Sequence, residues 1–276
     1  MRNGQFDLSG RVAIVTGAGE KAFCAGNDLK WQAAGGKRGW DKGGFAGLTS
    51  RFDCDKPIIA AVNGFALGGG CEFQMHSAKT VAALESYIGL VEAGVGLLPA
   101  GGGLKELAVR ASEAAGPNGD VFAELKKTFE TIAMAKVSNS AVNAKELGLL
   151  RADDIVVFHA HELLHVARQQ ALALAEAGYR PPLPARAIRV AGDVGIATFK
   201  MLLVNMLEGR FVSPYDYEIA ERIATVLCGG DVDRNAVVDE DWLIRLERTH
   251  FVELAQQEKT QARIGHMLKT GKPLRN

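Results

Sequence analysis

Short runs of apolar and β-branched residues recur along the first 160 positions of the chain, each beside a glycine-rich turn or a segment with helical spacing. Runs of this length and composition predict buried β-strands. They cover residues 11–16, 57–62, 80–84 and 154–158.

Apolar residues at intervals of three and four predict helices among these strands. The helices cover residues 104–111, 121–133, 144–147 and 162–177. Gly148 and Gly178 follow the last two helices, as is typical of residues that end a helix. Because strands and helices alternate, the first two thirds of the chain are predicted to be of the α/β class.

The last third of the chain is predicted to be mostly helical. Residues 195–207 are apolar at helical spacing, and residues 239–268 form a long segment that is charged on one face. The sequence Ser-Pro-Tyr-Asp at 213–216 supplies an N-cap, a proline at the first helical position and an acid at the third.

A proline-rich stretch marks the boundary between the two parts. Three of the four residues at 181–184 are prolines, which cannot continue the preceding helix. We therefore expect an α/β core over residues 1–185 and a helical C-terminal region over residues 186–276.

The amino-acid composition disfavours several classes of protein. The 276 residues include 32 Lys and Arg against 32 Asp and Glu. This balance lacks the usual charge of a protein that binds nucleic acid or an anionic membrane. No apolar run approaches the ~20 residues of a membrane span, and no signal-peptide stretch follows the first residues. The four cysteines form no CxxC pair, which disfavours a disulfide scaffold and a structural zinc site. We expect a cytoplasmic protein with no nucleic-acid and no membrane partner.

Residues 6–19, FDLSGRVAIVTGAG, resemble the first strand and turn of the short-chain dehydrogenases. The nucleotide-binding turn of that family needs further glycines where this chain has Lys21 and Phe23. The Tyr and Lys that the family places four residues apart are also missing. We interpret the segment as a buried strand and turn rather than a nicotinamide site.

Residues 161–165 read HELLH, the HExxH motif in which two histidines on one helical face bind zinc beside a glutamate base. A zinc protease needs a third ligand from a further element, whereas Glu176 lies on the same helix and His159 just before it. We interpret the motif as the start of an amphipathic helix and expect no metal site. The residues expected to face the core are Leu163, Leu164 and Val166.

Two glycine-flanked turns, each near the end of a strand, are the strongest candidates for chemistry. The first is AFCAGNDL at 22–29, and the second is KPIIAAVNGFALGGGCE at 56–72, where a triple glycine precedes a helix. Such turns can aim two backbone N–H groups at one point, and a helix N-terminus adds a favourable dipole. This arrangement is an oxyanion hole built without side chains.

Two acids accompany the turns. Glu72 falls in the first turn of the helix, and Glu92 follows twenty residues later within YIGLVEAGVGLLPAGGG at 87–103. The apolar, glycine-rich surroundings of Glu92 indicate a carboxyl that is not simply solvated. The simpler interpretations are a helix-terminus charge for Glu72 and a loop charge for Glu92.

Together these segments resemble the crotonase superfamily, and specifically the enoyl-CoA hydratases. The later part of the chain, through CGGD at 228–231 to the end, resembles the hydratase end of bacterial multifunctional 3-hydroxyacyl-CoA dehydrogenase/enoyl-CoA hydratases. The resemblance implies a spiral of ββα units followed by a helical region. Because the family pattern has a further segment before the strand at 11–16, we expect the first turn of the spiral to be largely missing.

The resemblance also implies roles for individual residues. The backbone N–H groups of Asn27 and Gly69 would hold the thioester oxygen, while Glu72 and Glu92 would share the catalytic water and transfer protons. Neither a metal nor a nicotinamide cofactor is required, because the coenzyme A thioester is the substrate. A trimer-based homo-oligomer is also typical of the family. The neighbours expected to contact the substrate are Ala25, Gly26, Asp28, Gly68 and Gly70.

The expected function is the reversible syn addition of water to a trans-2-enoyl-CoA, giving a 3-hydroxyacyl-CoA in fatty-acid β-oxidation. An enoyl-CoA isomerase is the second hypothesis, and retention of both Glu72 and Glu92 favours hydration over it. A catalytically silent crotonase-like subunit is a third hypothesis, from a different class. The zinc protease and the short-chain dehydrogenase are weaker alternatives.

Overall fold

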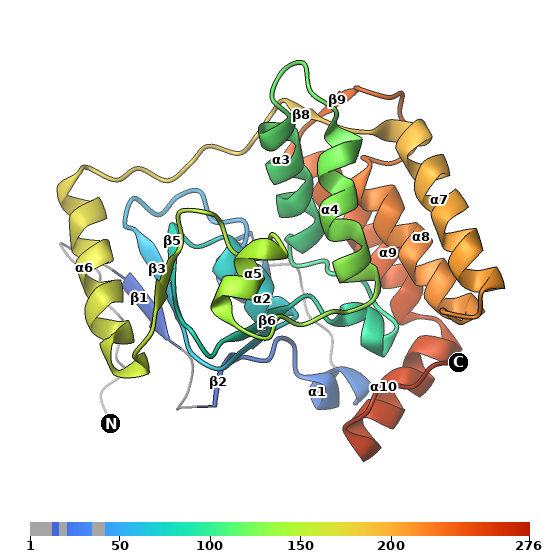
Figure 1. The fold of residues 1–276 in the computed structure, drawn as a ribbon, viewed down its shortest axis with the longest axis horizontal. Helices are drawn as coiled ribbons and strands as arrows, with labels where there is room; N and C mark the ends of the chain where they lie inside the picture. Colours follow the sequence, from blue (N-terminus) through green and yellow to red (C-terminus); the bar gives the residue numbers. More distant parts are fainter. Residues whose placement is uncertain (1–12, 17–20, 35–41) are drawn as a thin grey trace.

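A computed structural model of the protein describes residues 13–16, 21–34 and 42–276, and consecutive strands in it alternate between two parallel sheets (Figure 1). The four-stranded sheet has the order β1 (Ala13–Thr16), β3 (Ile58–Val62), β5 (Lys79–Ala83) and β7 (Ile155–Val157). The three-stranded sheet has the order β2 (Ala22–Cys24), β4 (Phe65–Leu67) and β6 (Tyr87–Gly89). Because each strand leads into the other sheet, the chain climbs as a spiral. The predicted α/β class is confirmed.

The central strands are buried on both faces, as expected of parallel strands that are covered on each side. On one face, Ile59 and Ala61 of β3 pack against helix α6 (Leu163–Glu176) through Ala167 and Ala171. On the other face, Ala60, Val62 and Ala82 belong to the main core of the protein. The helix α6 and the other helices therefore lie on opposite sides of this sheet (Figure 1).

Short helices and turns connect the strands of the spiral. The helices are α1 (Leu29–Ala33), α2 (Gly69–Met75), α3 (Gly103–Ala115), α4 (Val121–Ala133) and α5 (Ala141–Glu146). The 3-10 turns are η1 (Phe45–Gly47), η2 (Glu92–Val95) and η3 (Ala160–Glu162). Side-chain oxygens begin two of the predicted helices: Asp120 accepts from the Phe122 N–H at 3.1 Å, and Ser140 accepts from the Asn143 N–H at 3.1 Å.

The C-terminal region contains four helices and a small antiparallel sheet. The helices are α7 (Gly192–Glu208), α8 (Pro214–Leu227), α9 (Glu240–Ala255) and α10 (Glu258–Thr270). The sheet pairs β8 (Ile188–Arg189) with β9 (Val237–Val238), and α7 and α8 lie between these strands in the chain. The predicted start of α8 is confirmed, because Ser213 and Asp216 form a reciprocal capping box.

The single long helix predicted over 239–268 is wrong. The chain leaves helical geometry at Gln257, whose backbone is extended, and α10 begins at the next residue. The change of direction turns the buried side of α10, which includes Thr260 and Arg263, toward η2 and α8. Tertiary contacts therefore override the helical pattern at this point.

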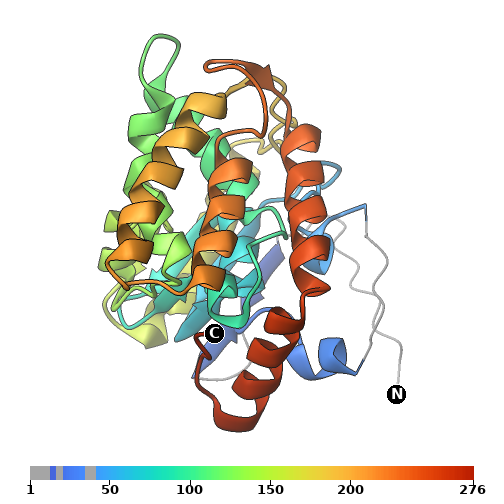
Figure 2. The same ribbon diagram turned by 90° about the vertical axis from the view of Figure 1, so that its right-hand side faces the viewer.

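The C-terminal helices pack onto the helices that follow the spiral. Helices α3 and α4 contact α8, and α3 also contacts α9, so one hydrophobic core contains Leu104 and Leu125 together with Ile223 and Leu254. Helix α10 lies beside α1 (Figure 2). The boundary drawn at residue 185 stays a prediction. No helix within the described residues is long and apolar enough to cross a membrane.

A buried arginine joins α10 to η2 and α8. The Arg263 side chain is 0% exposed and donates to Asp216 Oδ1 at 2.8 Å and to the Ala93 carbonyl at 3.2 Å. Its guanidinium also lies 5.0 Å from the centre of the Tyr215 ring. The same Asp216 oxygen accepts from Arg275, whose side chain is 42% exposed.

We expect Arg263→Ala to lower the free energy of unfolding by about 3–5 kcal/mol, because it leaves a buried carboxylate without its buried partner. The matched control is Arg275→Ala, which removes a half-exposed partner of the same oxygen and should cost about 1 kcal/mol or less. Urea titrations followed by circular dichroism measure both values. Equal losses in the two variants would contradict this interpretation.

Candidate active site

The two glycine-flanked turns of the sequence meet in the structure. A Cβ on Gly26 would lie 2.9 Å from the Gly69 nitrogen, and a Cβ on Gly70 would lie 2.1 Å from the Cys24 carbonyl oxygen. The end of β2 therefore lies directly against the start of α2, at a distance that only glycine permits. Gly69 is the first residue of α2, where a helix N–H has no intrahelical acceptor.

The substrate-contact residues predicted around these turns lie in different environments. Gly68 and Gly70 are buried, Gly26 is half-buried and Ala25 is exposed. Asp28 serves the local backbone, because its Oδ1 accepts from the N–H groups of Lys30 and Trp31 at 2.9 and 3.2 Å. The Asp28 carboxylate therefore acts as the N-cap of α1.

Glu72 is buried and bound to the start of α3. The residue is 3% exposed, and its Oε1 accepts from the N–H groups of Gly101 and Gly103 at 2.8 and 3.0 Å. Burial raises the pKa of Glu72 to about 7, although the two amide hydrogen bonds and the Lys105 charge oppose the shift.

Glu92 begins the η2 turn and lies next to the second glycine-rich turn. Its Oε1 is 2.9 Å from the place of a Cβ on Gly68. Its Oε2 is buried and has no hydrogen-bond partner within the described part of the chain. Burial raises the pKa of Glu92 well above its usual range, and the charges of Glu72 and Glu247 raise it further. The carboxyl groups of Glu72 and Glu92 are therefore electrostatically coupled, and they titrate as a pair.

Sequence reasoning missed a third buried carboxyl group. Glu247 of α9 is 0% exposed and accepts from the N–H groups of Gly102 and Lys105 at 3.0 and 2.6 Å. The available signal was its position, because Leu243 and Leu254 share the buried face of α9 with it. A glutamate in line with core leucines is unusual in a helix that otherwise resembles a solvated one.

Behind these acids, Lys105 and His76 form a buried polar network that the sequence did not indicate. The Lys105 Nζ lies 2.9 Å from His76 Nε2, and the His76 Nδ1 lies 2.7 Å from the Glu72 carbonyl oxygen. Burial lowers the pKa of His76 to about 3, and the Lys105 charge acts in the same direction. A neutral imidazole fits both contacts, since Nε2 can accept from the ammonium while Nδ1–H donates to the carbonyl.

Phe45 of η1 covers the start of α2. A Cβ on Gly69 would lie 2.4 Å from the Phe45 ring, and a Cβ on Gly101 would lie 2.9 Å from the Phe45 Cβ. An aromatic ring of the protein itself thus crowds Gly69. No feature of the sequence indicates that a residue so far from the triple glycine packs there.

The weaker motifs do not converge on this site. His161, Glu162 and His165 are exposed around the junction of η3 and α6, and no three potential metal ligands gather within the described ranges. Leu163 is buried as predicted, but Leu164 is 55% exposed, so the prediction that it faces the core is wrong. Leu164 follows the buried Leu163 directly, so its side chain lies on a different side of the helix, away from the core. The glycines at 17–19 of the dehydrogenase-like turn lie outside the described residues.

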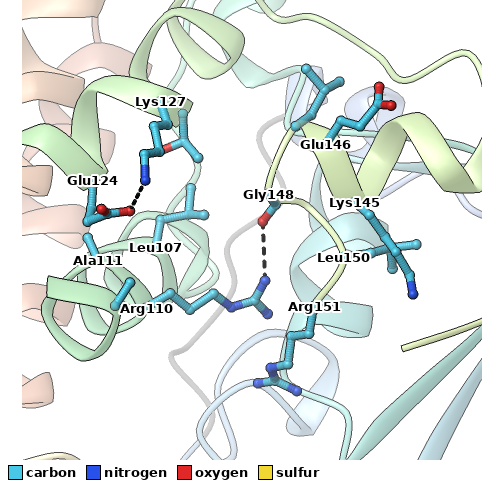
Figure 3. Close-up of a pocket in the computed structure, with 13 residues that line it drawn as sticks. Leu107, Arg110, Ala111, Glu124, Lys127, Lys145, Glu146, Gly148, Leu150 and Arg151 are labelled. Atoms are coloured by element: carbon cyan, nitrogen blue, oxygen red, sulfur yellow. Dashed lines mark hydrogen bonds and ion pairs between the residues drawn. The ribbon is translucent and has the colours of Figure 1, made fainter. Parts of the chain in front are cut away.

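A cavity of about 310 Å³ lies between α3, α4 and the segment around Gly148, away from the buried acids (Figure 3). Its basic side chains have partners: Arg110 donates to the Gly148 carbonyl, and Lys127 pairs with Glu124. The residues predicted to act on substrate are not among those that line this cavity.

Comparison with known proteins finds similarity to one family. The enoyl-CoA hydratase/isomerase family profile matches residues 3–118. A solved carnitinyl-CoA dehydratase from Mycobacterium avium 104 aligns with 98% of this chain and 82% of its own, at 29% identity and a TM-score of 0.55. The chain is therefore similar to the crotonase superfamily. The crotonase-like α/β fold predicted from the sequence is thereby confirmed.

Curated relatives match this chain over parts of their own length. A probable 3-hydroxyacyl-CoA dehydrogenase of Bacillus subtilis (strain 168) is 42% identical over 221 residues, which cover 80% of this chain and 28% of that protein. A carnitinyl-CoA dehydratase of Proteus mirabilis (strain HI4320) is 41% identical over 143 residues, 51% of this chain and 54% of that enzyme. The chain thus spans about a quarter and about half of the length of these two relatives.

The raised pKa of Glu72 predicts a dependence of stability on pH. Between its usual value of 4.5 and about 7, the folded protein holds a proton that the unfolded chain has released. Stability should therefore fall as pH rises through this window, by on the order of 1–3 kcal/mol. Glu72→Gln removes the titration, so urea unfolding across the window should give a flatter curve for the variant. Parallel curves for the two proteins would contradict the buried, protonated state.

Proposed function

We propose that this protein catalyses the reversible addition of water to a trans-2-enoyl-CoA, giving a 3-hydroxyacyl-CoA. The observation that carries the proposal is the pair of coupled buried carboxyl groups, Glu72 and Glu92, beside the junction of two backbone turns. The names of the relatives, which include carnitinyl-CoA dehydratases, support a lyase acting on a coenzyme A thioester.

The backbone would stabilise the charge that develops on the substrate. When water adds to the β-carbon of an enoyl thioester, electron density moves onto the carbonyl oxygen. In this proposal the N–H groups of Asn27 and Gly69 bind that oxygen, and the α2 N-terminus supplies a favourable dipole. Because the Gly69 N–H belongs to a buried, glycine-packed turn, it needs little reorganisation as the charge appears.

The two glutamates would move the protons. One glutamate, as a carboxylate, removes a proton from water as the water oxygen bonds to the β-carbon. The other glutamate, as a carboxylic acid, gives a proton to the α-carbon. The pair then holds the same number of protons as before. This division requires one charged and one neutral carboxyl near neutral pH, which burial and mutual repulsion favour. A pKa of about 7 for Glu72 is also close to the optimum for general acid–base catalysis.

Retention of two acids favours hydration over double-bond isomerisation, because an isomerase can move one proton with a single shuttle. In the proposed mechanism neither a metal nor a nicotinamide takes part. The unpartnered Oε2 of Glu92 supports a role toward a bound molecule, since buried carboxyl oxygens are normally hydrogen-bonded. A catalytically silent subunit would be supported instead if the purified chain bound no coenzyme A thioester.

We expect Glu72→Gln and Glu92→Gln each to lower the rate of crotonyl-CoA hydration by at least ~100-fold, because each removes a general acid or base. The assay follows the loss of absorbance of the conjugated thioester. Glu85→Gln, which changes an exposed glutamate between β5 and β6, is the matched control and should retain activity. Full activity in either test variant would remove that residue from the mechanism.

Gly69→Ala should also lower the hydration rate by on the order of 100-fold, because loss of one oxyanion-hole donor has an effect of this size. The added Cβ would strike the Phe45 ring and displace the turn. Asn27→Ala should be mild by contrast, since Asn27 is proposed to act through its backbone N–H.

The double variant Phe45→Ala/Gly69→Ala tests the cause of this loss. Recovery toward the activity of Phe45→Ala alone would assign it to the collision with the ring. If Asn27→Ala were as damaging as Gly69→Ala, the Asn27 side chain would act directly and the proposed hole would be wrong.

A further inference from the structure

The first turn of α3 is shared between two buried carboxyl groups. Glu72 accepts from the N–H groups of Gly101 and Gly103, whereas Glu247 accepts from those of Gly102 and Lys105. The two acids therefore bind alternate amides along one short stretch of backbone. One comes from α2 and the other from α9, so the contacts join segments up to 145 residues apart.

The stretch has no capping side chain of its own. Gly102 is the N-cap of α3 and has a positive φ of 103°, and no side-chain cap hydrogen bond is formed from it. A Cβ on Gly101 would lie 2.4 Å from Glu72 Oε2, and a Cβ on Gly103 would lie 2.9 Å from Glu72 Oε1. Two carboxyl groups from elsewhere in the fold thus replace the usual local cap.

Glu247 controls the peptide unit that lies between the two donors to Glu72. Because Gly101 and Gly103 flank Gly102, a rotation at Gly102 would turn one of the two amides relative to the other, so that both could no longer bind the single Oε1 atom that they share. The hydrogen bond of 3.0 Å from Gly102 to Glu247 Oε2 opposes that rotation. The bond of 2.6 Å from Lys105 to Glu247 Oε1 fixes the other end of the turn.

We propose that Glu247 is a positioning residue for the Glu72–Glu92 pair: it holds the Gly101–Gly103 backbone that orients Glu72, and where its own carboxyl group ionises, its charge opposes loss of a proton from the pair. The first half of this inference concerns the fold alone. The second half gains its catalytic meaning from the proposed hydration.

The charges around Glu247 come from several elements. Glu72 lies on α2, Glu92 on η2, and Lys105 is the buried base on α3. The pKa of Glu247 is raised to about 8. Burial and the charge of Glu72 raise it, whereas the two amide hydrogen bonds and the Lys105 charge lower it. The remaining titratable groups that contact Lys105 are His76, Glu106 and Glu240.

The groups around the three acids do not supply enough positive charge to balance three ionised carboxylates. The Lys105 ammonium is directed to His76, Glu106 and Glu240, at 2.9, 3.6 and 3.7 Å. His76 is neutral near neutral pH because its pKa is lowered to about 3. Mutual repulsion among Glu72, Glu92 and Glu247 therefore favours retention of protons.

Three variants separate charge from positioning. Glu247→Gln removes the charge at nearly constant shape, and Glu247→Asp keeps the charge but shortens the reach to the two amides. Glu240→Gln is the matched control, because it changes another buried glutamate of α9 that contacts Lys105 at 3.7 Å without binding the Gly102 amide. The readouts are kcat, KM and the pH profile of crotonyl-CoA hydration, with urea unfolding alongside.

We expect Glu247→Gln to lower kcat by on the order of 10- to 100-fold, as for a misplaced catalytic group, with KM changed by less than ~2-fold. The alkaline limb of the variant's pH–rate profile should move to lower pH, because Glu92 loses a negative neighbour that raises the pKa of Glu92. Glu247→Asp should lose kcat while its alkaline limb stays near that of the wild type. Glu240→Gln should not reproduce this shift if the inference is right, whatever its effect on stability.

Two outcomes would overturn the inference. One is a Glu247→Gln variant with the kcat and pH profile of the wild type. The other is an equal shift of the alkaline limb in Glu240→Gln, which would assign the effect to the general loss of buried charge on α9. If Glu247→Gln does not fold, Glu247→Asp decides the positioning half through its kcat.

A failure of the proposed function gives a different result. If the wild type does not hydrate crotonyl-CoA, that function falls, and titration of ¹³C-labelled glutamate carboxyl groups by NMR still tests Glu247. Glu247→Gln should lower the titration midpoint assigned to Glu92. Between pH of about 4.5 and about 8, the free energy of unfolding of this variant should fall less than that of the wild type. Unchanged midpoints and unchanged pH dependence would overturn the inference without reference to activity.

Discussion

The site depends on the ability of one helix terminus to hold two acids inside the protein. A carboxylate in an apolar interior is destabilised by several kcal/mol unless hydrogen bonds and opposite charge compensate it. The amides at the start of α3 supply four such hydrogen bonds to Glu72 and Glu247, and the helix dipole favours negative charge at the same place. Only glycine backbones permit the approach at Gly101 and Gly103.

This constraint links the spiral to the C-terminal helices. Helix α9 carries Glu247 to the start of α3, which in turn holds Glu72. Helix α10 acts on the other acid, because Arg263 donates to the Ala93 carbonyl within the η2 turn and Thr260 donates to the carbonyl of Gly96, the residue that follows the turn. Both candidate catalytic acids are therefore supported by residues that lie more than 140 positions later in the chain.

The sequence predicted those parts of the structure that leave a local signal. Apolar runs indicated the strands of the larger sheet, and Ser213 and Asp216 indicated the start of α8 through their capping chemistry. The three strands of the smaller sheet each have only three residues, too few for an alternating pattern to be recognised. The break at Gln257 has no glycine or proline to mark it, because contacts of α10 with η2 decide it.

The same distinction applies to the site. Glu72, Glu92 and the turns around Gly26 and Gly69 stand in segments whose order along the chain indicates their chemistry. Glu247 gave only a weak signal, its alignment with Leu243 and Leu254, because one glutamate in a charged helix is normally solvated. The packing of α9 on α3 shows that it is buried. Phe45 was unpredictable, because its contact with Gly69 depends on the path of a loop.

The contacts of Lys105 explain why burial, rather than a nearby cation, decides the direction in which the pKa of Glu72 is shifted. An ammonium bound directly to Glu72 would hold that carboxyl ionised and lower its pKa below the usual range. Here the Lys105 ammonium contacts His76, Glu106 and Glu240, while only its backbone N–H binds an acid of the trio, Glu247. The charge of Lys105 thus partly offsets the burial of Glu72 without abolishing the raised pKa. A site arranged in this way keeps a carboxyl group that can both accept and release a proton near neutral pH.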